Sequence, residues 1–370
     1  MAQFGGMGGM GGMGGMGGMG GMGGMGGMGG GTNVTGLGAF FGQQDPGGYD
    51  GTTTMGIQTT SEGLRHLSLG GAMPTTKELP FSNVENMSGM ATWVRGSLYI
   101  SEFLSKIKVE TDAAAKAVTL KFDDQKFLEV TRPRMGLLRD QCDFIADYSV
   151  LRAERSAEII SQLGFPTPYF AMILGLNTAQ ASKTFELITA TQVLAAHTAM
   201  IVKHHLAIRR PDQLDARIMP MIPVPGHGSF PSAHATEAYA VLRVMEAVVD
   251  EWGSLSDAPQ RVATLRALAE RIAVNRTVAG VHYPIDSWCG AALGQLVGDV
   301  VLSRCGKGPQ IQPMDFAPTA NVDFFDDDFR DAAKATAAGL TKDGNQTHTL
   351  GGSPLFGWLW SEVEGESQGV

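Results

Sequence analysis

The 370-residue sequence contains only three cysteines, Cys142, Cys289 and Cys305. They are few, odd in number and without the Cys-x-x-Cys spacing of zinc ligands, so neither a disulfide framework nor a structural zinc site is expected. We interpret all three as buried or idle thiols.

Long apolar runs and an N-terminal export signal are also missing. The first thirty residues have neither a basic start nor a core rich in leucine or valine. The two most apolar windows, Ile188–Val202 and Pro284–Leu302, are interrupted by polar or charged residues. They fall short of the roughly 18–20 apolar residues that a membrane span needs. We therefore predict a soluble, cytoplasmic protein without a membrane span.

An excess of positive charge is absent as well. The formal net charge is −9 and the isoelectric point is near 5.4, so a broad surface for nucleic acid or another polyanion is not expected. Any anion site has to be a local cluster of cations. The 43% of hydrophobic residues is enough for one large core or two modest domains.

Glycine, in contrast, is abundant, and much of it lies in one N-terminal tract. From Met7 to Met28 the chain repeats Met-Gly-Gly, with eight methionines at period three. Because glycine loses much conformational entropy on ordering, we predict a disordered Met/Gly-rich tail over residues 1–51. Thioethers bind soft metals such as Cu(I), but a flexible tail is the simpler interpretation. We divide the rest into a helical domain over 52–305 and a loop-rich extension over 306–370.

The remaining pattern is mostly helical. Ile107–Glu110 and Val118–Phe122 alternate apolar and polar residues, which predicts two short strands or a hairpin. Apolar residues three and four apart predict helix from Met135 onward, with a break at Pro166 and Pro168. Further helices are predicted over Thr178–His205, Ser232–Trp252, Pro259–Val278, Pro284–Arg304 and Leu355–Glu364. The predicted fold class is therefore mainly α, with a possible small β-hairpin before the core bundle.

The segment beyond Cys305 has a different character. Asp323–Asp331 is a short acidic run with phenylalanines, which we interpret as a solvated segment rather than a cation site. Gly339–Pro354 has the composition of a loop.

A first polar motif pairs Lys203 with Arg210, which Pro211 follows directly. Seven residues are nearly two helical turns, so both side chains would project from one side of a helix that ends at the proline. Two basic residues near a helix C-terminus usually only complement the helix dipole. By itself, this motif does not indicate a site.

A second motif is the loop Gly226–His234, which leads directly into a predicted helix. A Gly/Pro-rich loop before a helix points free backbone N–H groups outward, which suits an anion. Ser232 adds a hydroxyl and His234 an imidazole. The alternative is that Ser232 is only an N-cap and His234 a surface residue.

A third motif combines Arg276, His282 and Asp286, with Pro284 in the first turn of a predicted helix. A carboxylate four residues after a histidine can orient its ring, which fixes the tautomer and makes the other nitrogen a better nucleophile or ligand. The guanidinium of Arg276 matches tetrahedral oxyanions. Taken alone, a surface arginine beside a helix-start His–Asp pair explains the pattern equally well.

Taken in order, Lys-x6-Arg-Pro, Pro-Ser-x-His and Arg-x5-His-x3-Asp resemble the signature of one superfamily. It joins vanadium-dependent haloperoxidases with type 2 phosphatidic acid phosphatases and bacterial non-specific acid phosphatases. The resemblance spans Lys203–Asp286 and is specific, because three spaced motifs must coincide. It implies a helical bundle of the haloperoxidase/acid phosphatase type, and a catalytic role for the domain over 52–305.

The resemblance also implies a role for each residue. His282 would be the ligand of vanadium in a haloperoxidase, or the phosphorylated nucleophile in a phosphatase, with Asp286 as its partner and His234 as the acid/base. The superfamily usually has Ser where this chain has Asn275, a change expected to matter little. It usually has Gly in place of Ala233, and a backbone donor survives that change. The oxygens of vanadate or phosphate would be bound by Lys203, Arg210, Ser232, the amide of Ala233, and Arg276.

Two functions remain open, because the membrane lipid phosphatases need several spans that this sequence is not expected to have. His227 resembles a second active-site histidine of bromoperoxidases, although an ordinary loop histidine is the alternative. On that basis we predict a vanadate-dependent haloperoxidase that oxidises bromide or iodide with hydrogen peroxide and halogenates an organic acceptor. The other function is a soluble phosphatase that hydrolyses phosphate monoesters through a phosphohistidine.

The form of the third motif, His-Tyr-Pro-x-Asp, and the compact spacing of Lys203 and His234 favour the phosphatase. A third hypothesis is a non-catalytic scaffold protein in which the Met-Gly tail is the working part, but the intact set of polar site residues counts against it. A homo-oligomer is compatible with the sequence.

Overall fold

The computed structural model describes residues 51–66, 78–253, 255–342 and 346–367. The predicted Met/Gly-rich tail lies outside these residues except for Gly51, the first residue of α2 (Gly51–Leu64). A 3-10 turn, η3 (Val84–Gly89), and helix α3 (Thr92–Ser105) then lead into a sheet.

The sheet has five strands in the order β1-β2-β3-β4-β5. Neighbours are antiparallel except β3 and β4, which run parallel with Leu128 opposite Met314. The two predicted strands are present as β1 and β2. The sheet is larger than the expected hairpin because β3 follows β2 directly and the chain beyond Cys305 returns to add the last two strands. The bounds are β1 Ile107–Asp112, β2 Ala117–Phe122, β3 Gln125–Thr131, β4 Met314–Phe316 and β5 Leu340–Lys342.

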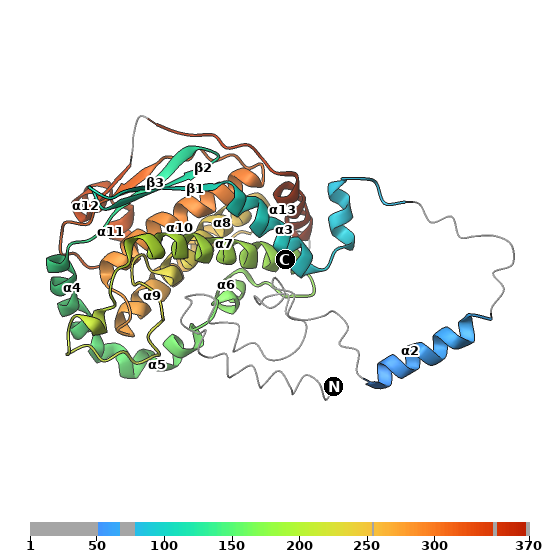
Figure 1. Ribbon diagram of the computed structural model, residues 1–370, viewed down its shortest axis with the longest axis horizontal. Coiled ribbons are helices and arrows are strands. Elements are labelled where there is room, and N and C mark those ends of the chain that lie inside the picture. Colours follow the sequence, from blue (N-terminus) through green and yellow to red (C-terminus); the bar gives the residue numbers. More distant parts are fainter. Residues whose placement is uncertain (1–50, 67–77, 254, 343–345, 368–370) are drawn as a thin grey trace.

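Helices make up most of the described chain, which confirms the mainly α class (Figure 1). Pro166 and Pro168 do interrupt the helical pattern, but they also start a new helix, with Pro166 at its N-cap and Pro168 in its first turn. Short 3-10 turns, η4 (Ser149–Leu151) and η5 (Pro211–Gln213), connect neighbouring elements. The helices are α4 Met135–Tyr148, α5 Arg152–Ser161, α6 Thr167–Leu174, α7 Ser182–Leu206, α8 Ala233–Trp252, α9 Ala258–Val278 and α10 Pro284–Arg304.

The C-terminal segment is more ordered than the predicted loop-rich extension. It supplies β4 and β5 and three helices, the last of which matches the helix predicted near the C-terminus. The Glu366 carboxylate of that helix accepts hydrogen bonds from the backbone N–H groups of Lys183 (2.6 Å) and Thr184 (2.8 Å) at the start of α7. The segment therefore packs on the helical body. Its helices are α11 Asp326–Arg330, α12 Ala332–Ala338 and α13 Pro354–Glu366.

The acidic run was expected to be solvated, and that prediction holds only in part: Asp327 and Asp331 are exposed, but other residues of the run are buried. Phe324 and Phe329 are buried, with their rings 5.7 and 6.0 Å from that of Trp288. The buried Asp326 carboxylate accepts a hydrogen bond from the Tyr239 hydroxyl at 2.9 Å. The aromatic residues hold the run against α8 and α10, and this packing outweighs the hydration of the Asp326 carboxylate.

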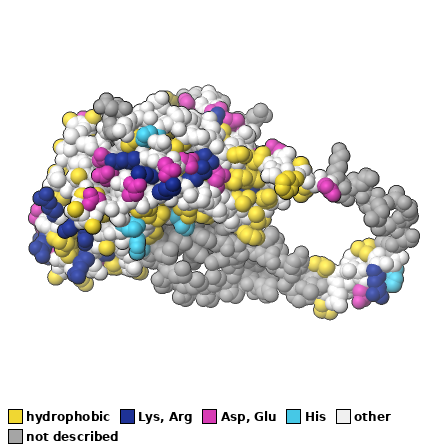
Figure 2. Space-filling view, turned by 45° about the horizontal axis from the view of Figure 1, so that its top comes forward, with side chains coloured by type: hydrophobic (Ala, Val, Ile, Leu, Met, Phe, Trp, Pro, Cys, Tyr) yellow, Lys and Arg dark blue, Asp and Glu magenta, His cyan; other side chains and the backbone are white. Residues whose placement is uncertain are grey.

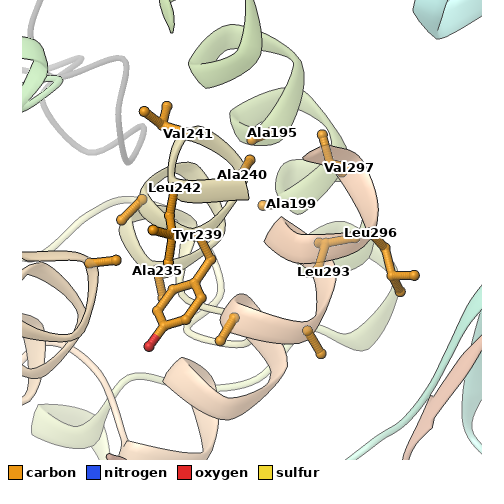
Figure 3. Packing of buried hydrophobic residues seen from close by; sticks show 14 of the residues in the cluster. Ala195, Ala199, Ala235, Tyr239, Ala240, Val241, Leu242, Leu293, Leu296 and Val297 are labelled. Carbon is orange, nitrogen blue, oxygen red and sulfur yellow. The ribbon is translucent and has the colours of Figure 1, made fainter. Parts of the chain in front are cut away.

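The centre of the core is formed by α7, α8 and α10, and Figure 3 shows buried side chains that these three helices contribute. Gly290, Gly294 and Gly298 lie four residues apart on the face of α10 that meets α8. A Cβ atom on Gly290 would lie 2.7 Å from the carbonyl oxygen of Ser232, and one on Gly294 would lie 2.4 Å from that of Thr236. The two backbones therefore touch, and the N-termini of α8 and α10 lie side by side. All three cysteines are buried and free, as predicted.

The face that carries β1–β3 mixes charges of both signs. Figure 2 shows Lys and Arg side chains interleaved with Asp and Glu across it. Three ion pairs lie at the strands and the turns beside them: Lys106–Asp123 at 2.7 Å, Lys108–Asp124 at 2.6 Å and Lys121–Glu110 at 2.6 Å. This face therefore has no continuous positive area for a polyanion.

One helical stretch among the described residues, Ser182–Gln213, is long and apolar enough to cross a membrane by length and composition alone. No such stretch was expected from the sequence. Its most apolar window has a mean hydropathy of 1.4, and 83% of that window is buried inside the protein. The core helix of a soluble protein passes the same test, so this finding by itself does not place the helix in a membrane.

Candidate active site

The first motif is split between a helix and the loop after it. Lys203 lies in the last turn of α7, which ends at Leu206, and Ala207 adopts a left-handed conformation (φ 49°). Arg210 therefore lies beyond the helix in extended backbone (φ −72°, ψ 156°). The prediction that both side chains project from one helix is wrong, although the two residues do meet.

Lys203 and Arg210 meet because both bind the loop that carries the second motif. The Lys203 Nζ donates hydrogen bonds to the carbonyl oxygens of Gly228 (2.9 Å) and Ser229 (2.7 Å). The Arg210 Nε donates to the carbonyl oxygen of His227 at 3.1 Å. Burial and the charge of Arg210 lower the pKa of Lys203 well below its usual value. A bound anion would offset this effect and favour the charged lysine.

The third motif arranges a histidine and a carboxylate at the start of α10. The Asp286 Oδ2 accepts hydrogen bonds from the backbone N–H of Tyr283 (3.2 Å), from His282 Nδ1 (2.7 Å) and from the hydroxyl of Ser229. Because the carboxylate is only an acceptor, His282 carries its proton on Nδ1. Its Nε2 atom lies 3.1 Å from the Arg210 Nη1, which donates to it. The lone pair of Nε2 therefore points toward the guanidinium of Arg210.

The protonation of this pair follows from its burial. Burial raises the pKa of Asp286 from 3.8 to about 6, and the hydrogen bond from Ser229 and the nearby cations limit the rise. Burial, and then the charges of Arg210 and Lys203, lower the pKa of His282 well below 6.5. At neutral pH the pair is therefore a carboxylate beside a neutral imidazole, the state in which Nε2 is nucleophilic.

The second motif lies at the start of α8. The Ser232 Oγ accepts a hydrogen bond from Ala235 N at 3.3 Å, so this residue does cap the helix. Its hydroxyl hydrogen can still point elsewhere. Ala233 is the first residue of α8, and its N–H has no partner within the helix. His234 is 7% exposed, and burial followed by the charge of Arg276 lowers its pKa well below 6.5.

Arg276 lies at the C-terminal end of α9 and is almost completely buried. Its Nη2 donates to the carbonyl oxygen of Ile159 (3.3 Å) and to Gln162 Oε1 (3.1 Å). Its Nε and Nη1 are buried and make no hydrogen bond to any described residue. Burial lowers the pKa of Arg276 to about 10, so the group stays charged at neutral pH. Buried donors without acceptors are unfavourable, and a ligand rich in oxygen acceptors would satisfy them.

His227 contacts the same cluster. Its Nδ1 lies 3.1 Å from the Arg210 Nη2. Burial, and then the charges of Lys203 and Arg210, lower the pKa of His227 to about 3, so its ring is neutral at neutral pH. The structure thus brings His227 to the edge of the candidate site, where its role as a second active-site histidine stays a prediction.

The site also includes residues that the sequence analysis did not assign. Ser229 lay inside the second motif, and its pairing with Asp286 depends on a fold that the sequence could not show. Gln162 had no sequence signal, because it lies far from all three motifs along the chain. Asn275 was expected to matter little, yet its Nδ2 donates to Gln162 Oε1 (3.0 Å) and to Glu158 Oε1 (2.8 Å). These contacts connect α9 to α5.

Three cations, the N-terminus of α8 and two histidines converge here, from α7, α8, α9 and the loops before η5 and α10, and such an arrangement suits the binding of an oxyanion. Residues 184–305, which carry all of these groups, match the model of the PAP2 superfamily, so this part of the chain is a PAP2 superfamily domain. The superfamily predicted from the three motifs is confirmed.

Similar proteins from this superfamily are phosphatases. Two curated relatives, both decaprenylphosphoryl-5-phosphoribose phosphatase from Mycobacterium tuberculosis (strains CDC 1551 and H37Rv), are 34% identical over 121 residues. The match covers 32% of this chain and 61% of each relative. A transmembrane PAP2 type phosphatidylglycerolphosphate phosphatase from Bacillus subtilis superimposes with a TM-score of 0.39 and 20% identity, over 47% of this chain and 88% of that one.

Proposed function

We propose that this protein is a phosphatase that hydrolyses phosphate monoesters with His282 as the nucleophile. The observation that carries the proposal is the position of His282, whose Nδ1 donates to Asp286 while its Nε2 faces the guanidinium of Arg210. The phosphatase relatives favour this function over the haloperoxidase that we predicted first.

In the first step, the lone pair of His282 Nε2 attacks the phosphorus atom and the ester P–O bond breaks. The unpaired donors of Arg276, together with Lys203 and Arg210, would bind the phosphoryl oxygens and stabilise the charge that develops on them. His234 gives its proton to the leaving alkoxide. A bound phosphate offsets the charge of Arg276, and this raises the pKa of His234 so that the ring can carry that proton.

In the second step, water attacks the phosphohistidine, His234 takes a proton from the water and the P–N bond breaks. Phosphate leaves and His282 regains its lone pair. His282 keeps its proton on Nδ1 throughout, and Asp286 accepts the hydrogen bond from it. The carboxylate also stabilises the positive charge that the ring carries while it is phosphorylated.

The same donors fit vanadate, a phosphate analogue that readily becomes five-coordinate. Lys203, Arg210, Arg276 and the start of α8 would hold its oxygens and His282 would bind the metal. Bound vanadate would supply the centre that activates hydrogen peroxide for the oxidation of halide. This haloperoxidase function is the alternative proposal, and it shares every residue of the site with the phosphatase.

A paired assay on the purified full chain separates the two functions. One arm supplies p-nitrophenyl phosphate without vanadate, and the other supplies orthovanadate, hydrogen peroxide, bromide and a dye that accepts bromine. We expect hydrolysis in the first arm, competitive inhibition of it by orthovanadate, and no bromination in the second. Bromination without ester hydrolysis would replace the proposed function by its alternative. Because the relatives are named for a lipid-linked sugar phosphate, decaprenylphosphoryl-5-phosphoribose is the second ester to assay.

The pH dependence of hydrolysis should report Asp286. A protonated Asp286 no longer accepts the Nδ1 proton of His282, so kcat/KM should fall as the pH drops through the carboxyl pKa of about 6. Stability has the opposite sign. Because folding raises this pKa from 3.8, the contribution of Asp286 to stability is fully present below about pH 4 and is lost as the pH rises through 6.

The measurements are a pH profile of kcat/KM and urea unfolding over the same pH range. Asp286→Asn is the comparison. This variant should lose most of the activity, and the activity that remains should no longer fall at low pH. If kcat/KM of the wild-type protein falls only below pH 4, Asp286 is not the group that controls the activity at low pH.

A further inference from the structure

Gln162 is a buried glutamine that contacts groups from two of the three motifs. It caps the C-terminal end of α5 and is 0% exposed. Its backbone carbonyl oxygen accepts a hydrogen bond from His234 Nε2 at 2.9 Å. Its side-chain Oε1 accepts from Arg276 Nη2 at 3.1 Å and from Asn275 Nδ2 at 3.0 Å. One residue thus fixes an imidazole of the second motif and a guanidinium of the third.

The side chain of Gln162 decides which part of Arg276 faces a ligand. Nη2 is held between Oε1 of Gln162 and the carbonyl oxygen of Ile159, whereas Nε and Nη1 are left without an acceptor among the described residues. Because the amide oxygen is neutral, it orients the guanidinium without cancelling its charge. A carboxylate at the same place would form an ion pair and weaken the attraction of Arg276 for an anion.

The backbone of Gln162 decides the tautomer of His234. A carbonyl oxygen is only an acceptor, so Nε2 must carry the hydrogen and Nδ1 is the nitrogen that gains and loses a proton. In the described part of the chain, Nδ1 of His234 makes no hydrogen bond, which leaves it for a substrate or water.

Asn275 and Glu158 hold Gln162 in this position. Gln162 Nε2 donates to Glu158 Oε1 at 3.2 Å, and Asn275 Nδ2 donates to the same oxygen at 2.8 Å. Arg271 balances the charge of that carboxylate with an ion pair at 2.7 Å. The charge of Glu158 is therefore partly balanced by Arg271, and the described groups that accept hydrogen bonds from Arg276 are both neutral: the amide oxygen of Gln162 and the carbonyl oxygen of Ile159.

We propose that Gln162, held by Asn275, is a positioning residue that directs the free donors of Arg276 toward the bound oxyanion and sets the reactive nitrogen of His234. The role of His234 in this proposal rests on the proposed phosphatase function. The role of Arg276 in binding an oxyanion does not depend on that function. It gives Asn275, which stands where the superfamily usually has serine, a specific task.

The test compares Gln162→Glu and Gln162→Leu with Gln192→Leu. Gln192 is an equally buried glutamine whose Oε1 accepts a hydrogen bond from Thr167 at 2.8 Å, and none of its hydrogen bonds reaches a site residue. We expect Gln162→Glu, which keeps the shape of the side chain, to weaken the binding of orthovanadate about tenfold or more, because it neutralises Arg276. Gln162→Leu should weaken it several-fold, with a raised KM and a shifted pH profile. Gln192→Leu should keep wild-type affinity.

The affinities are measured by titration calorimetry with orthovanadate, and thermal unfolding checks that each variant is folded. If Gln162→Glu does not fold, Asn275→Ala provides the same comparison through the residue that holds Gln162. Wild-type affinity in folded Gln162→Glu would overturn the positioning role, and so would a wild-type chain that binds no vanadate. A wild-type chain that binds vanadate but hydrolyses no ester would contradict only the proposed function.

Discussion

Replacing His282 with alanine should reduce phosphatase turnover by roughly a thousandfold or more, because it removes the atom that attacks phosphorus. The remaining cations would still bind the phosphate group, so the loss should fall on kcat rather than on the affinity for orthovanadate. Asp286 and Arg210 would each lose a hydrogen-bond partner at 2.7 and 3.1 Å, and some loss of stability should accompany the change.

The control for this change is His204→Ala. His204 is an exposed histidine one residue after Lys203, and its ring lies edge-on to that of His205 at 5.0 Å. It should keep full activity. Turnover by His282→Ala at the level of His204→Ala would show that another group is the nucleophile.

A covalent intermediate gives a second and independent readout. Labelled substrate mixed with the wild-type protein should leave a phosphoryl group that survives base and is lost in acid, as a phosphohistidine does. With p-nitrophenyl phosphate, whose leaving group needs no proton from His234, His234→Ala should accumulate this species, because His234 activates the water that cleaves it. His282→Ala should not form it. Rapid-quench labelling followed by peptide mapping checks both expectations.

The sequence predicted the residues of the site better than their geometry. The spacing of His282 and Asp286 within one helical turn was enough to predict their contact, because both lie at the start of one helix. The spacing of Lys203 and Arg210 led to the wrong local structure. The helix ends at Leu206, and the two cations meet through a loop whose path depends on the rest of the fold.

Two contacts between distant segments were not predicted from the sequence. Ser229 reaches Asp286 across 57 residues, and Gln162 reaches Arg276 across 114. Each of these pairs depends on how α5, α8, α9 and α10 pack together. That packing leaves no local motif or periodicity in the sequence from which the contacts could be predicted. The helices themselves were predictable because apolar periodicity, N-terminal prolines and the Ser232 cap act locally.

The same difference between local and distant effects explains the C-terminal segment. Its strands are three residues long and its acidic run contains few apolar residues, so periodicity favoured loop. The pairing of β4 with β3, and the packing of Phe324 and Phe329 on Trp288, determine its structure instead. Tertiary packing here outweighs local propensity.

Replacing Gly294 with alanine should destabilise the protein by roughly 3 kcal/mol, although alanine is the better helix former by about 1 kcal/mol. The new Cβ atom would lie 2.4 Å from the carbonyl oxygen of Thr236, 2.9 Å from the Cβ of Tyr239 and 3.0 Å from the amide nitrogen of Ala240. All three atoms belong to the buried face of α8 and cannot rotate away. The two helices must separate, and the core around them in Figure 3 loses its close packing.

The matched control is Gly357→Ala in α13, the same substitution inside a helix, where the new Cβ would meet no atom within 4 Å. It should leave stability unchanged or raise it slightly. Urea unfolding of both variants gives the comparison, with an expected fall in the midpoint for Gly294→Ala alone. His234 lies in the first turn of α8, and His282 lies just before the start of α10. Separation of the two helices should therefore also lower the activity of protein that is still folded. Equal stability of the two variants would mean that α10 can shift along α8 without cost, and that the glycines do not set the distance between the two histidine-bearing ends.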